Sequence, residues 1–203
     1  YSRSPFVEDA EYMYAKGLYY SSPSSRRDQT TTSQAIVAID EYLNRYPNSS
    51  KKESLQECIN DLQQRIYDKA MENAKLYYDI GYYNSAIVAL RNAINTYPES
   101  NHRELLSYLI VRSHYLYAKN SVETKQRQRY MDMQDAYYSF VAEYPESAYR
   151  KEADKMQADS KKFLDKFSAK EAAKEKAKET AEAHKKAKSG KHVIDDVDPD
   201  NAP

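Results

Sequence analysis

The dipeptide Tyr-Pro occurs three times in the chain, and each copy is followed two residues later by serine. The three copies are Tyr46-Pro47-Asn48-Ser49, Tyr97-Pro98-Glu99-Ser100 and Tyr144-Pro145-Glu146-Ser147. An alanine precedes each tyrosine by eight residues, at Ala38, Ala89 and Ala136. Proline cannot continue a helix and disfavours the α conformation in the residue before it, so each block predicts a helix that ends at Tyr-Pro. The following serine can cap the next helix. The repeat therefore predicts a stack of helical hairpins.

The middle repeat shows this pattern most clearly. Apolar residues recur at steps of three and four from Leu55 to Tyr77, which predicts one long helix over about residues 52 to 79. Gly81 follows, and we expect it in the left-handed conformation just after the helix end. Six residues fall at the small, Tyr, Ala, apolar, Ala and Pro positions of the tetratricopeptide pattern: Ala74, Tyr77, Ala86, Leu90, Ala93 and Pro98. This resemblance implies an all-α, tetratricopeptide-like helical-hairpin solenoid with a C-terminal capping helix.

The chain divides into five predicted parts. Residues 1–50, 51–100 and 101–147 each form a helical hairpin, and the second hairpin has the long first helix. Residues 148–168 carry an apolar stripe that suits a helix capping the open end of the stack. Residues 169–203 are rich in Lys, Ala and Glu without an apolar stripe, so we expect a solvated or disordered tail.

Successive Tyr-Pro pairs lie 51 and 47 residues apart, whereas an ideal repeat of this kind has about 34 residues. Long helices and inserted loops account for the difference. Polar stretches from Ser21 to Thr32 and from Asn120 to Arg127 are the predicted loops inside the first and third hairpins. Such loops are common places for specific contacts.

Composition excludes several classes of function. The 31 basic residues are balanced by 31 acidic ones, so the chain lacks the cationic excess that nucleic-acid binding requires. The three glycines are isolated and form no phosphate-binding loop. The four histidines form no close metal-binding pair, and the single cysteine, Cys58, lies in an apolar helical pattern as a buried thiol. We therefore expect a protein that is not an enzyme and has no cofactor or metal.

Membrane anchoring is not encoded by an apolar segment. No run of about eighteen apolar residues exists, and the first six residues lead into no hydrophobic segment of a signal peptide. The chain does not begin with methionine, so we expect a targeting sequence upstream of it.

The order of several short segments resembles one known family. These segments are Tyr14-Ala15-Lys16-Gly17-Leu18, Arg27-Asp28, Leu62-Gln63-Gln64-Arg65 and Gly81-Tyr82-Tyr83, together with the Tyr-Pro pairs. They resemble the BamD family, the tetratricopeptide-like lipoprotein subunits of the outer-membrane β-barrel assembly (BAM) machinery. The resemblance runs from about Tyr1 to Phe167 and corresponds to the last three of the family's five repeats.

This resemblance implies a non-catalytic scaffold at the periplasmic face of the cell outer membrane, held by a lipid anchor upstream of the present chain. Its implied partners are the POTRA domains of a BamA-like barrel subunit, other BAM lipoproteins and, mainly through repeats that precede this segment, unfolded outer-membrane proteins. We expect the docking surface on the long helix and the adjoining turn. Arg65 is the candidate charge anchor, and Tyr83 and Asn84 are candidate contact residues at the hairpin tip.

Two alternatives remain open from the sequence. One is a periplasmic tetratricopeptide adaptor in envelope maintenance, whose repeats end in similar Tyr-Pro-x-Ser segments but keep a period closer to the ideal. The other is the ligand-binding domain of a glycan-uptake lipoprotein or of an enzyme, which the 21 tyrosines keep open. The absence of tryptophan and the scarcity of glycine weigh against a sugar-binding cleft.

Overall fold

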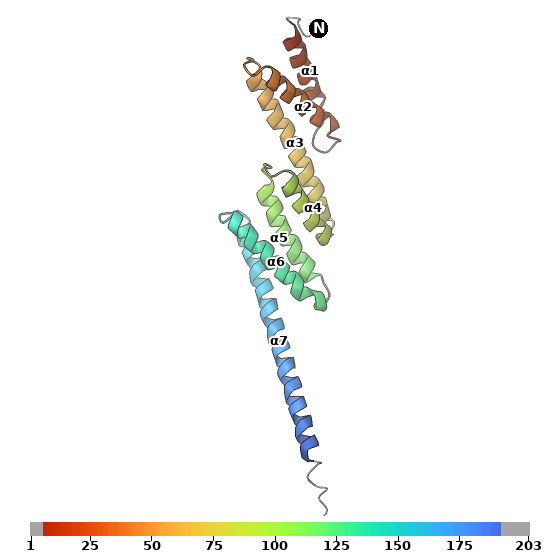
Figure 1. The fold of residues 1–203 in the computed structure, drawn as a ribbon, viewed down its shortest axis with the longest axis vertical. Coiled ribbons are helices and arrows are strands. Elements are labelled where there is room, and N and C mark those ends of the chain that lie inside the picture. The colour runs from red at the N-terminus through yellow and green to blue at the C-terminus, as the bar shows by residue number, and fades with distance from the viewer. Residues whose placement is uncertain (1–5, 192–203) are drawn as a thin grey trace, which may run out of the picture.

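The chain folds into an elongated stack of helices (Figure 1). The computed structural model describes the backbone of residues 6–191 and the side chains of residues 6–182. Within these residues all regular secondary structure is α-helical. The helices are α1 (Val7–Ser21), α2 (Thr30–Arg45), α3 (Lys52–Asp79), α4 (Tyr83–Thr96), α5 (Arg103–Lys119), α6 (Glu123–Glu143) and α7 (Arg150–Lys191). The predicted all-α helical-hairpin solenoid is thereby confirmed, and α3 has the bounds expected for the long helix.

Helix α3 joins two hydrophobic cores. Its N-terminal half supplies Leu55, Cys58, Ile59 and Leu62 to a first core with α1 and α2. Its C-terminal half supplies Ala74 to a second core that continues through α4, α5 and α6 to α7. Helix α3 packs against α1, α2, α4 and α5, whereas α2 and α4 do not pack against each other. The length of α3 thus sets the first two hairpins apart along its axis.

The three Tyr-Pro ends adopt one conformation. Tyr46, Tyr97 and Tyr144 are the C-terminal caps of α2, α4 and α6, with φ of −124°, −129° and −130° and ψ of 64°, 69° and 69°. The backbone N–H of the serine three residues later donates to each tyrosine carbonyl. The prediction that these serines are N-caps is wrong, because each serine precedes the N-cap residue of the next helix. Each serine Oγ instead accepts the backbone N–H two residues on, at Lys51, His102 and Tyr149.

Gly81 closes the α3–α4 turn in the predicted left-handed conformation, with φ of +82°. Its N–H donates to the Tyr78 carbonyl at 3.0 Å, and the N–H of Tyr82 donates to the Tyr77 carbonyl at 2.9 Å. This pair of bonds is the Schellman motif, which satisfies the last carbonyls of a helix. The motif fixes the direction in which α4 leaves α3.

Replacing Gly81 with alanine is expected to lower the free energy of unfolding by about 1–2 kcal/mol, because a Cβ disfavours the left-handed conformation. A Cβ at Gly81 meets nothing within 4 Å, so the cost is one of backbone conformation alone. Gly17 is the matched control, since it lies inside α1 and its Cβ also meets nothing within 4 Å. There the same substitution is expected to stabilise by about 0.5–1 kcal/mol. Urea unfolding of both variants measures the difference, and equal effects would contradict the assignment of Gly81.

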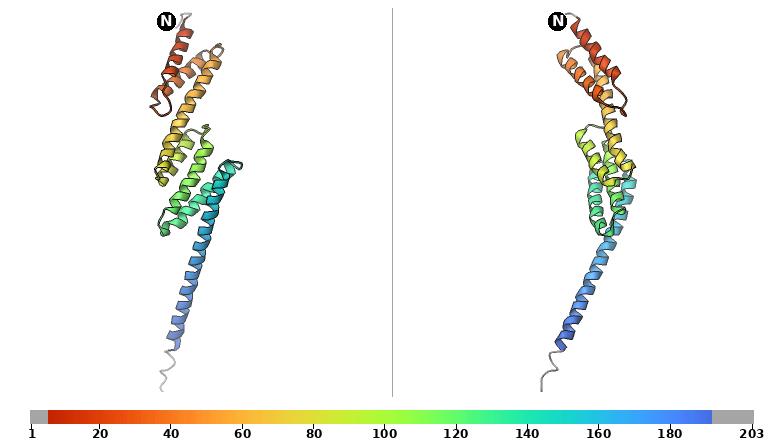
Figure 2. Two further views of the ribbon diagram at one scale, coloured as in Figure 1. Left: turned by 180° about the vertical axis from the view of Figure 1, so that it is seen from behind. Right: turned by 90° about the vertical axis from the view of Figure 1, so that its right-hand side faces the viewer.

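Two predicted boundaries differ from the structure. The loop expected from Asn120 to Arg127 is shorter, because α6 already begins at Glu123. Helix α7 continues without a break past residue 168 to Lys191, since Ala, Lys and Glu favour helix intrinsically. Figure 2 shows α7 leaving the stack beyond α6. From residue 168 to residue 182 its side chains are exposed, and residues 192–203 of the predicted tail lie outside the described residues.

The first part of α7 does pack against the stack. It contacts α5 and α6, and Ala153, Met156 and Ser160 are buried there. No helix in the part of the chain that the structure describes is both long and apolar enough to cross a membrane.

Candidate interaction surfaces

A groove lies between α2 and α4, with α3 as its floor. It has a volume of about 780 Å³. It exists because α3 separates the two hairpins, so that no helix fills the space between α2 and α4. Four alanines keep it open, namely Ala70 and Ala74 on α3 and Ala89 and Ala93 on α4. We call this hollow the hairpin groove.

Neutral polar groups line most of the remaining wall of the hairpin groove. Asn73 on α3 and Asn92 on α4 are exposed, and Tyr77 is 44% exposed. Lys69 is the one charged residue of the lining, and its Nζ donates to the Arg27 carbonyl at 2.8 Å. Carboxamides both donate and accept hydrogen bonds, so this groove suits a polypeptide segment better than an ion.

A second hollow lies where the α3–α4 and α5–α6 turns meet. It is lined by residues 81–85 together with Tyr117, Asn120 and Arg129, and its volume is about 250 Å³. We call it the tip pocket. Two of the three predicted contact residues, Tyr83 and Asn84, lie in its lining. The Tyr83 ring also packs against Tyr78, with ring centroids 6.0 Å apart, so only part of the Tyr83 side chain is available to a partner.

Five apolar side chains between residues 76 and 88, at the end of α3 and the start of α4, are exposed. These residues, with their exposed fractions, are Leu76 (55%), Tyr77 (44%), Ile80 (54%), Tyr82 (65%) and Val88 (55%). We call this set the turn patch. It lies beside both the hairpin groove, through Tyr77, and the tip pocket, through Tyr82.

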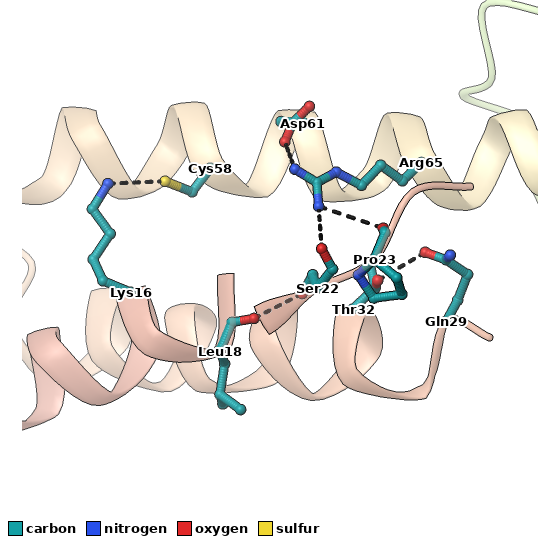
Figure 3. A network of polar contacts seen from close by, with 9 residues as sticks. All are labelled: Lys16, Leu18, Ser22, Pro23, Gln29, Thr32, Cys58, Asp61 and Arg65. Atoms are coloured by element: carbon teal, nitrogen blue, oxygen red, sulfur yellow. Dashed lines mark hydrogen bonds and ion pairs between the residues drawn. The ribbon is translucent and has the colours of Figure 1, made fainter. Parts of the chain in front are cut away.

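Arg65, the third predicted contact residue, has an internal role (Figure 3). From α3 its Nη1 donates to the Ser22 carbonyl at 2.8 Å, and its Nη2 pairs with Asp61 at 2.5 Å. Its guanidinium also lies over the Tyr19 ring, 5.4 Å from the centroid. The side chain therefore ties the end of α1 to α3 and leaves only 24% of its surface exposed.

The structure brings Tyr83 and Asn84 together but places Arg65 elsewhere. Between Arg65 and the end of α3 lies roughly 20 Å of helix, at about 1.5 Å per residue. The charged group that does accompany the two tip residues is Arg129 on α6. Sequence reasoning missed Arg129 because it lies in the segment interpreted as close to a loop, 45 residues beyond Asn84.

A smaller groove repeats the same geometry between α4 and α6, over α5. Its volume is about 330 Å³, and Arg91, Asp135 and Glu143 contribute charges to its wall. His114 on α5 lies beside it, with Nε2 3.5 Å from the Arg91 guanidinium. Burial lowers the pKa of His114 to about 4, and the positive charge of Arg91 acts in the same direction. Asp132 and Asp135 oppose this shift but do not outweigh it.

His114 is expected to make the fold less stable as the pH falls from 6.5 to 4. In this window the unfolded chain takes up a proton that the folded chain rejects, so stability rises with pH. The shift from 6.5 to about 4 corresponds to at most about 3 kcal/mol. Replacing His114 with glutamine should remove this part of the pH dependence. Urea unfolding at several pH values measures it, and parallel curves for the two proteins would refute the assignment.

No group of three or more His, Cys, Asp or Glu side chains within the described residues could hold a metal ion. Cys58 is buried, and Lys16 Nζ lies 3.3 Å from its Sγ. The fold defines a helical-hairpin repeat protein, whose grooves and exposed turn residues are candidates for binding a partner. Neither a comparison with protein-family models nor one with curated proteins finds a match for this chain.

Proposed function

We propose that this chain is a non-catalytic scaffold in outer-membrane β-barrel assembly, acting at the periplasmic face of the outer membrane. In this proposal it docks on the POTRA domains of the barrel-forming subunit. The turn patch is the single observation that carries the docking role, because it exposes Tyr77 and Tyr82, and tyrosine is a frequent anchor of protein interfaces. The choice of machinery comes from the ordered segments that resemble the BamD family.

The arrangement of the surfaces supports docking of a folded partner at the α3–α4 turn. Gly81 and its Schellman bonds hold the turn in one conformation, so the turn patch needs little ordering when a partner binds. The hairpin groove next to it offers carboxamides and an alanine floor to an extended segment of the same partner. Arg65 stabilises the scaffold in this view and does not contact the partner.

This proposal is tested by expressing the tagged protein from its own gene and purifying it by affinity from gently solubilised envelopes. We expect a barrel protein with POTRA domains to co-purify in near-equal amount. A double variant, Ile80→Ser with Tyr82→Ser, should reduce its recovery about tenfold, as loss of an interface anchor does. Val37→Ser is the matched control, because Val37 is 56% exposed on α2 and lies outside the turn patch.

The outcomes separate the machinery from the surface. If a different envelope complex co-purifies with the unaltered chain and not with the double variant, the assembly role is wrong but the turn patch is still the docking surface. If the double variant and the control recover equal amounts of the barrel protein, the interface lies outside the turn patch. Absence of any POTRA-containing protein, while other envelope complexes survive, would refute the proposed function.

A further inference from the structure

Arg129 presents a fixed positive charge in the tip pocket. Its guanidinium carbon lies 3.6 Å from the centroid of the Tyr117 ring, the shortest cation–π contact described in this chain. Its Nη1 donates to Ser121 Oγ, and that hydroxyl donates to the Tyr117 carbonyl. The Gln126 side chain also bonds the Ser121 carbonyl, at 3.0 Å. The α5–α6 turn therefore holds the Arg129 side chain in place before any ligand arrives.

Arg129 differs in its ion pairing from other arginines of the described residues. In the part of the chain that the structure describes, no carboxylate forms an ion pair with Arg129, whereas Arg103 and Arg150 pair with Glu143 and Asp154 at 2.8 Å. No acidic residue lines the tip pocket either. A guanidinium stacked on an aromatic ring remains able to bind a carboxylate with its free N–H groups. The pocket is thus complementary to a negative charge.

The surroundings of Arg129 indicate what carries that negative charge. The turns that border the pocket expose Ile80, Tyr82 and Val122, of which Tyr82 and Val122 are 65% exposed. An inorganic anion would leave these apolar side chains in water. A peptide segment with an acidic side chain between apolar ones would cover them and satisfy Arg129 together.

We infer that the tip pocket binds an acidic residue of a partner protein, with the carboxylate on Arg129 and flanking apolar side chains on the exposed residues of the two turns. This inference rests on the proposed docking role and adds the chemistry of the contact. Carboxylate bonds to arginine are charge-assisted and frequently bidentate, so they fix the register of a docked segment. Arg129 would then serve as the charge anchor that the sequence suggested for Arg65.

The peptide Ac-Gly-Ile-Glu-Val-Gly-NH2 is a suitable probe, titrated into the ¹⁵N-labelled chain and followed by NMR. We expect saturable shifts of the amide signals of residues 81–85 and 120–122 and of the Arg129 side chain. The same peptide with Gln in place of Glu should bind about tenfold more weakly, because it offers no charge to the guanidinium. Arg129→Gln should abolish the preference for Glu, and Arg129→Lys, which keeps a charge but loses the planar fork, should retain part of it.

Arg127→Gln is the matched control, since Arg127 lies on the same helix but pairs with Glu171 and contacts Phe167. The Arg127→Gln variant should bind the Glu and Gln peptides with the same affinities as the unaltered chain. Equal binding of the Glu and Gln peptides, or equal loss in the Arg127 and Arg129 variants, would overturn the inference. So would inorganic phosphate that displaces the Glu peptide at equal ionic strength, since the pocket would then be a site for small anions. Peptide binding without a POTRA-containing partner in envelopes would refute the proposed machinery alone.

Discussion

A chain that ends at Tyr149 is expected to lose the cooperative folding of its third hairpin, whereas a chain that ends at Ser168 keeps it. The first truncation removes all of α7, and the second removes only the exposed extension. The comparison tests whether the first five turns of α7 are the cap of the solenoid. Both chains retain the three Tyr-Pro repeats.

The expected loss follows from what α7 covers. Ala153, Met156 and Ser160 are buried against α5 and α6, and the Phe163 ring packs on Tyr130 with centroids 4.7 Å apart. The Tyr137 hydroxyl also loses the Asp154 carboxylate, to which it donates at 2.7 Å. At about 1.5–3 kcal/mol for each large apolar side chain, the loss of Met156 and Phe163 alone costs about 3–6 kcal/mol.

Residues beyond Ser168 contribute little by the same reasoning. Their described contacts with the stack are the surface ion pairs Lys170–Glu123 and Arg127–Glu171. Such pairs contribute about 0–1 kcal/mol each. Urea unfolding of the two truncated chains, followed by circular dichroism and tyrosine fluorescence, measures both effects. Equal stability of the two truncated chains would contradict the role of α7 as a cap.

Local sequence rules were sufficient where backbone chemistry decides the structure. Gly81 and the Tyr-Pro pairs mark helix ends because glycine adopts the left-handed conformation without steric cost and proline cannot continue a helix. The bounds of α3 follow from its unbroken apolar period between these marks. These features depend on neighbours in sequence, so they could be predicted without the fold.

Contacts between distant segments could not be predicted in the same way. Arg65 looked like a free charge on a helix face, but the chain folds back so that the Ser22 carbonyl, 43 residues away, accepts its hydrogen bond. The segment just before Arg129 was predicted to be a loop, because its residues are polar. From Glu123 onward it is in fact the first part of α6, a helix whose sequence has little apolar periodicity. Which arginine is neutralised internally and which faces solvent is therefore a property of the stack.

The hairpin groove shows a further consequence of the long third helix. In a solenoid of ideal repeats each hairpin packs on the next along its whole length, and side chains fill the space between them. Here α3 serves both as the closing helix of the first hairpin and as the first helix of the second. The excess repeat length noted in the sequence thus becomes an open surface between α2 and α4.

The position four residues before each Tyr-Pro tyrosine gives the second large prediction. It holds Tyr42, Ala93 and Phe140 in the three repeats, all in the cores. Phe140 is 2% exposed and its ring contacts Tyr108 and Tyr144, with centroids 6.3 Å and 5.8 Å apart. Phe140→Ala is expected to lower the free energy of unfolding by about 3–5 kcal/mol, because it removes buried surface and leaves a cavity.

Tyr138→Ala is the control on the same helix, since Tyr138 is 57% exposed. Its expected effect is within about 0.5 kcal/mol, as for most surface substitutions. Urea unfolding of both variants gives the comparison. A small effect at Phe140 would mean that the third hairpin repacks around the cavity, as the alanine at the equivalent position of the second hairpin allows. A large effect confined to Phe140 would show that the third hairpin uses this position for its core.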